Sequence, residues 1–91
     1  MAAQTAIRTQ HATLSGTTAD SVTLSHTSGS ELTVTNHDAT TTLYFRQDGT
    51  TAVAAADETY HVLPLQTKTV PFQGGVISVV GNGNVYSVET Y

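Results

Sequence analysis

The sequence predicts an all-β protein, an antiparallel β-sandwich of Ig-like or jelly-roll-like type with seven to nine short strands and an extended N-terminal arm. Apolar and polar residues alternate with a period of two, which is typical of half-buried strands. Short apolar runs separated by turn residues recur at roughly 8–10-residue intervals, and no window has helical periodicity. The 18 Thr fit this class because β-branched side chains suit a pleated surface.

The length of 91 residues fits a single domain. Residues 1–20 offer only Ile7 and Leu14 as bulky apolar side chains, so we expect an N-terminal arm or flexible segment there. Residues 21–91 are then the β-sandwich domain. In the functional interpretation the arm becomes ordered on a neighbouring subunit, with Ile7, Arg8 and Leu14 as candidate partner contacts. A repeat of Thr-Leu-Ser at positions 13 and 23 suggests a hairpin that turns through residues 16–20.

The first strands of the predicted sandwich alternate regularly. Val22 and Leu24 alternate with Thr and Ser, and after a turn at residues 28–30 Leu32 and Val34 do the same. Both segments are predicted as half-buried strands.

The next predicted strand has two distinct faces. Leu43 and Phe45 share one face, which we assign to the core, whereas Tyr44 and Arg46 face away from it. The turn signature at residues 47–50 ends this strand. The Ala-rich residues 52–56 fit either a short strand or a single helical turn.

The second half repeats the pattern. Residues 60–63 and 67–72 are predicted as strands at sheet margins, because each has a proline beside or within it. Residues 76–80, the most apolar run, are predicted as a central strand. The Asn-Gly link at residues 81–84 predicts a hairpin to a last strand at residues 85–89.

The charged residues limit the partners. Three cations, Arg8, Arg46 and Lys68, and a net charge of −4 disfavour nucleic acid and anionic membranes. No apolar run approaches the roughly 20 residues of a membrane-spanning helix, and the N-terminus lacks the features of a secretory signal.

The sequence favours no catalytic or cofactor site. The chain has no Cys, and none of its four His lies two to five residues from another, so we expect neither metal nor cofactor. It also lacks the Gly-x-Ser-x-Gly motif of serine hydrolases and a glycine-rich phosphate-binding loop that leads into a helix. We therefore expect no enzyme activity. What remains is a surface: outward Tyr44 beside Arg46 is a candidate for protein contact or sugar stacking.

Three segments carry a resemblance to a known group of proteins: LTVTN at residues 32–36, LYFRQDGT at residues 43–50 and VYSVET at residues 85–90. With the strands between them they resemble small β-sandwich virion proteins of tailed bacteriophages, particularly those of actinobacteria. The resemblance implies a capsid decoration (cement) protein on the virion surface. Such a protein sits in many copies on the shell, often as trimers, and holds neighbouring capsomers together. Its partners would be the major capsid protein and copies of itself.

Two other functions stay open. One is a tail, neck or fibre component of a phage particle. The other is a surface module that recognises carbohydrate through Tyr44 or Tyr60.

Overall fold

A computed structural model describes residues 8–24, 31–56, 59–72 and 75–90. Within these ranges the chain forms eight β-strands and no helix, which confirms the predicted all-β class. No described segment is therefore a helix long and apolar enough to cross a bilayer. In chain order the strands are β1 (Arg8–Thr13), β2 (Asp20–Leu24), β3 (Glu31–Asn36), β4 (Leu43–Arg46), β5 (Tyr60–Val62), β6 (Thr67–Pro71), β7 (Gly75–Val80) and β8 (Val85–Thr90).

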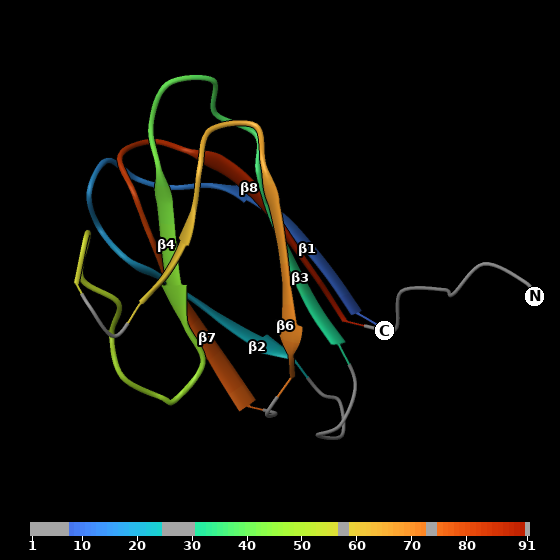
Figure 1. Cartoon of the computed structure of the whole chain (residues 1–91). Coiled ribbons are helices and arrows are strands. Elements are labelled where there is room, and N and C mark those ends of the chain that lie inside the picture. The colour runs from blue at the N-terminus through green and yellow to red at the C-terminus, as the bar shows by residue number, and fades with distance from the viewer. Residues whose placement is uncertain (1–7, 25–30, 57–58, 73–74, 91) are drawn as a thin grey trace, which may run out of the picture.

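The strands form two antiparallel sheets that pack face to face (Figure 1). Sheet A has the order β1-β8-β3-β6, and sheet B has the order β2-β7-β4-β5. The pairs β1 with β8, β2 with β7, β3 with β6 and β4 with β5 are nested around the connection between β4 and β5. One long hairpin wrapped so that successive pairs alternate between two sheets is a jelly roll. The connectivity therefore selects the jelly-roll-like alternative over the Ig-like one.

The two predicted hairpins are wrong. β7 lies in sheet B and β8 in sheet A, so residues 81–84 cross between the sheets instead of turning back. β1 and β2 likewise lie in different sheets, joined through residues 14–19. The two crossings lie side by side: Gly83 N donates to Gly16 O at 2.9 Å, and Leu14 N donates to Asn84 O at 2.9 Å. Turn residues predict that the chain changes direction. They do not predict whether the strands before and after the turn pair with each other.

The sandwich begins earlier in the chain than expected. Part of the predicted arm is strand β1, paired with β8 from Arg8↔Thr90 to Thr13↔Val85. Leu14 is only 3% exposed and belongs to the core. The domain boundary expected at residue 21 is thus too late in the chain, because the sandwich already includes β1. An edge strand can have few apolar residues, since its partner strand supplies the backbone hydrogen bonds. Ile7 lies outside the described residues, as do the turns expected at residues 28–30.

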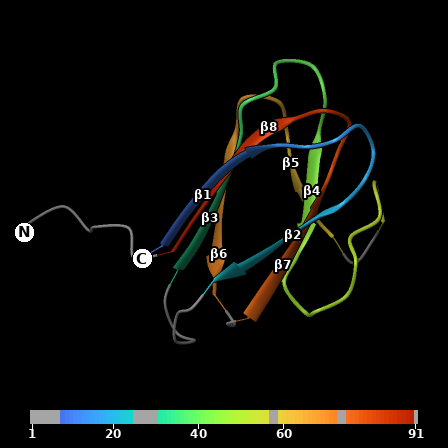
Figure 2. The same ribbon diagram turned by 180° about the vertical axis from the view of Figure 1, so that it is seen from behind.

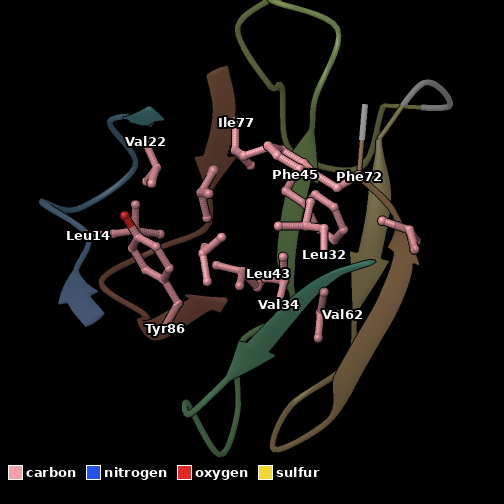
Figure 3. Packing of buried hydrophobic residues seen from close by; sticks show 13 residues of the cluster. Leu14, Val22, Leu32, Val34, Leu43, Phe45, Val62, Phe72, Ile77 and Tyr86 are labelled. Atoms are coloured by element: carbon pink, nitrogen blue, oxygen red, sulfur yellow. The ribbon is translucent and has the colours of Figure 1, made fainter. Parts of the chain in front are cut away.

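The core lies between the sheets (Figure 3). Leu43 and Phe45 are fully buried there, as predicted, and Phe45 stacks on Tyr60 with ring centroids 4.9 Å apart. Tyr86 is also buried, and its hydroxyl donates to Asp20 Oδ2 at 2.8 Å. Burial raises the pKa of Tyr86 above its usual value. The buried cluster consists of Leu14, Val22, Leu32, Val34, Leu43, Phe45, Val62, Val70, Phe72, Ile77, Val79, Tyr86 and Val88.

Two fully buried asparagines hold together one end of the sandwich. Asn84 Nδ2 donates to Asn36 Oδ1 at 3.0 Å and to Thr41 O at 2.8 Å, and Asn84 Oδ1 accepts from Asn82 N at 2.8 Å. Asn36 Nδ2 donates to Thr41 O at 2.8 Å and to Val62 O at 3.1 Å. These bonds join the β3–β4 connection, β5 and the β7–β8 crossing, so buried polar groups that would otherwise be costly are satisfied.

The predicted sheet margins are confirmed. β5 and β6 are edge strands, and β7 is central between β2 and β4. Residues 52–56 form neither a strand nor a helical turn. They make a β-turn in which Ala56 N donates to Val53 O at 3.2 Å and Ala55 has a φ of 61°.

Candidate functional site

The outer face of sheet B carries the two surface residues that the alternation of β4 predicts. Tyr44 and Arg46 point away from the core, opposite Leu43 and Phe45. The Tyr44 ring meets the His61 ring edge-on, with centroids 4.9 Å apart and planes at 84°. Tyr44 is therefore half-buried by its neighbour on β5 and presents only part of its ring for contact.

Arg46 forms an ion pair with Asp48 just beyond the end of β4. Its Nε donates to Asp48 Oδ1 at 2.9 Å, and its Nη2 contacts Oδ2 of the same carboxylate. Thr50 N also donates to Asp48 Oδ1, at 3.1 Å. The Arg46 hydrogen bonds, followed by that of Thr50, lower the pKa of Asp48 to about 2. The pair fixes the turn after β4, and its more exposed member is the carboxylate.

The connection between β4 and β5 folds back over sheet B. At its start, Gln47 Nε2 donates to Pro71 O of β6 in sheet A at 2.8 Å; further along, Ala52 N donates to Ser78 Oγ of β7 in sheet B at 2.8 Å. Ala52 and Ser78 are both buried as a result. A groove remains between this connection and the strands β2 and β7. We call it the sheet B groove; it is lined by Ala19, Asp20, Ser21, Gly49, Thr50, Thr51, Val76 and Ser78.

The sheet B groove is small and polar. Its volume is about 100 Å³, well below the roughly 300–1,000 Å³ of typical small-molecule pockets. Among its described lining residues Asp20 is the one that is charged, and that carboxylate already accepts the Tyr86 hydroxyl. The groove therefore has room for a small polar group and not for a whole sugar ring or nucleotide.

The outer face of sheet A carries two histidines that share one hydroxyl. His11 Nδ1 and His37 Nε2 each lie 2.8 Å from Ser87 Oγ, and the two ring centroids are 5.3 Å apart. The described residues contain no group of three or more His, Asp or Glu that could hold a metal ion. The arrangement is thus a hydrogen-bonded triplet that bridges β1, β8 and the end of β3.

Beside this triplet, threonines of β3 and β6 pair across the same face. The hydroxyls of Thr33 and Thr69 are 3.1 Å apart, as are those of Thr35 and Thr67. These cross-strand pairs make this part of the surface polar and add a modest stabilisation.

A turn at one end of the sandwich exposes two leucines. Leu63 and Leu65 are 61% and 64% exposed. Gln66 N donates to Leu63 O at 3.0 Å, with Pro64 at the second turn position and Leu65 at the third, where φ is 59°. That third position favours Gly or Asn, since a left-handed backbone is unfavourable for Leu. Leu65 N also donates to Asp38 O at 3.0 Å, which anchors the turn.

The structure does not bring the sequence-predicted contact residues together. Arg8 begins β1 in sheet A, whereas Tyr44 and Arg46 lie on the outer face of sheet B. Leu14 is buried, so the expectation that it contacts a partner is corrected: its side chain packs inside its own domain. The exposed leucine turn was missed. The available signal is Pro64 between two leucines, a residue order that fits a turn with an apolar side chain on either side.

Comparisons with protein-family models, with curated proteins and with solved structures found no match to this chain.

Proposed function

We propose that this chain is a non-enzymatic structural protein of a phage virion, a capsid decoration protein on the outer shell. In this role it contacts the major capsid protein and copies of itself and stabilises the contacts between capsomers. The observation that carries the proposal is the leucine turn at residues 63–66. It presents apolar side chains on a rigid jelly roll.

The leucine turn is costly for an isolated domain. Leu65 adopts a left-handed backbone conformation that costs about 1–2 kcal/mol for a residue with a side chain. Its side chain gains little burial in return, because it is mostly exposed. Burial of Leu63 and Leu65 against a partner would offset this cost at roughly 25 cal/mol per Å² of apolar surface. The turn is therefore suited to docking on a protein surface.

Other features agree with a contact role. The sheet B groove is too small to enclose a substrate, and the outer face of sheet A carries paired hydroxyls beside the carboxylate of Glu89. Many copies on a symmetric shell would multiply modest individual contacts. The resemblance of residues 32–90 to small phage virion proteins supplies the identity of the assembly.

The test is the abundance of this chain in purified virions, measured by quantitative mass spectrometry against the major shell protein. Hundreds of copies per particle are expected. Six to a few dozen copies would instead favour a neck, tail or fibre component, and absence from virions would contradict the proposal.

The docking role of the leucine turn has its own test. Capsids assembled without this chain are mixed with purified protein, and binding is measured by co-sedimentation. Leu63→Ser with Leu65→Ser is expected to weaken binding at least tenfold. Val53→Ser is the matched control, because Val53 is equally exposed, at 62%, on a different connection. Equal binding by both variants would refute the docking role.

A carbohydrate-binding module is the second candidate, favoured by the partly exposed ring of Tyr44. Glycan binding that Tyr44→Ala abolishes while the fold persists would support it. The edge-on packing of His61 on Tyr44 leaves less ring face for sugar stacking, which disfavours this function.

A further inference from the structure

The outer edge of β1 has backbone groups without a strand partner among the described residues. Among the described strands, β1 lies first in sheet A and pairs only with β8 (Figure 2). Leu14 N donates to Asn84 O, so residues 14 and 84 form a hydrogen-bonded pair. This pair is in register with the β1–β8 pairing, which runs from Thr13↔Val85 to Arg8↔Thr90. Hydrogen-bonded pairs alternate along an antiparallel ladder, so Ala12 and Gln10 bond to β8. The N–H and C=O groups of Thr9, His11 and Thr13 therefore point away from the sheet.

The opposite edge of sheet A is protected against pairing. Asn36 N donates to Gln66 O, so by the same alternation Thr67, Thr69 and Pro71 face outward from β6. Pro71 has no N–H to offer at this edge. Lys68 on the same strand lies over the Tyr60 ring, 5.9 Å from its centroid, and an inward lysine is a known device against edge pairing.

The other two edges are also less suited to pairing than β1. β5 has three residues, which limits the ladder it can form. β2 is one residue shorter than β1; each begins with a charged residue, Asp20 or Arg8, and neither contains a further Asp, Glu, Lys or Arg. Among the edge strands of the described residues, β1 is therefore the longest that has no proline and no charged residue after its first position.

We propose that β1 pairs antiparallel with β1 of a second copy, about a two-fold axis at His11. In this register position 9 lies opposite position 13 of the other copy, and His11 lies opposite its counterpart. Every outward N–H of positions 9, 11 and 13 then meets a carbonyl of the other copy. No like charges face each other, so the edge is complementary to itself.

The pairing joins two copies of sheet A into one continuous sheet. A two-fold contact uses the same surface on both copies and closes, so the product is a dimer and not a trimer or a fibre. The main-chain hydrogen bonds supply the affinity, as in other cases of strand addition. This inference rests on the proposed function, in which copies of this chain contact each other, and it specifies the surface of that contact. Dimer formation is measured on the purified chain, whereas the proposed function is tested by the abundance of the chain in virions. Failure of one can therefore be distinguished from failure of the other.

The first experiment is site-specific cross-linking. The chain has no Cys, so one introduced thiol reports on one position. Opposed Cα atoms of a hydrogen-bonded pair lie about 5.5 Å apart, within the roughly 4.4–6.8 Å that a disulfide spans. With diamide as oxidant, His11→Cys is expected to form a covalent dimer at micromolar concentration. Thr69→Cys, at an outward position of β6, is the matched control and is expected to stay monomeric.

The second experiment is sedimentation equilibrium on the unmodified chain, which is expected to show a reversible monomer–dimer equilibrium. Thr13→Pro removes one outward N–H per copy without cutting a bond to β8, and should raise the dimer dissociation constant roughly tenfold or more. Thr69→Pro should leave it unchanged, and circular dichroism checks that both variants fold. A monomer at several hundred micromolar, a trimer, or equal cross-linking at positions 11 and 69 would overturn the proposal.

Discussion

The buried Asn84 gives the sharpest test of how the strand crossings are held. Its side chain makes three hydrogen bonds, two from Nδ2 to Asn36 Oδ1 and Thr41 O and one from Asn82 N to Oδ1. Asn84→Ala removes all three. At about 1 kcal/mol net per hydrogen bond the loss is about 3 kcal/mol. Asn36 Oδ1 still accepts from Asp38 N, and Thr41 O still accepts from Asn36 Nδ2. Neither oxygen is left without a hydrogen bond, so no further loss of stability is expected.

A loss of about 3 kcal/mol is large for a domain of this size, whose total stability is of order 5–15 kcal/mol. With a urea m-value of about 1–3 kcal/mol/M, the midpoint should fall by about 1–3 M. Urea titration followed by circular dichroism measures it. Asn82→Ala is the matched control: it is the same change in the same crossing, but Asn82 is exposed, so a shift within about 0.5 kcal/mol is expected. Equal midpoints for the two variants would refute the role assigned to the Asn84 network.

Three further predictions concern backbone space, strain and pH. A Cβ on Gly81 would lie 2.3 Å from Asn84 Oδ1, so Gly81→Ala should destabilise by about 1–3 kcal/mol and by clearly less in an Asn84→Ala background; additive urea midpoints would count against the clash. Leu65→Gly should raise the free energy of unfolding by about 0.5–1 kcal/mol, since φ of 59° costs Gly nothing, and a lowered melting temperature would contradict this. The pKa of Asp48 is lowered to about 2 by Arg46, so its stabilising contribution is present above pH 4 and is lost as pH falls toward 2. In Arg46→Gln the melting temperature should therefore fall less between pH 4 and pH 2 than in the unmodified chain. An equal fall in both proteins would exclude the ion pair as its cause.

The individual strands were accessible from local patterns. The alternation of Leu43 and Phe45 with Tyr44 and Arg46 correctly separated the core face of β4 from its outer face. The prolines correctly placed β5 and β6 at sheet margins. Both inferences depend on single-strand geometry, which is a property of neighbouring residues alone.

Strand pairing was not accessible in this way. The Asn-Gly link at residues 81–84 predicts a hairpin, yet β7 and β8 lie in opposite sheets, and a crossing uses the same turn residues. The candidate contact surfaces depend on this pairing. The outward edge of β1, the shared hydroxyl of Ser87 and the exposure of Leu65 follow from contacts with segments far away in the chain.

The sequence by itself determined the all-β class, most strand positions and the two faces of β4, because a period of two is readable within a few residues. Only the tertiary structure decided that the strands wrap as a jelly roll, that Leu14 is buried and that residues 8–13 complete sheet A. The physical reason is that burial and backbone pairing depend on which distant strand comes alongside. For β1, whose own residues are mostly polar, that partner is β8.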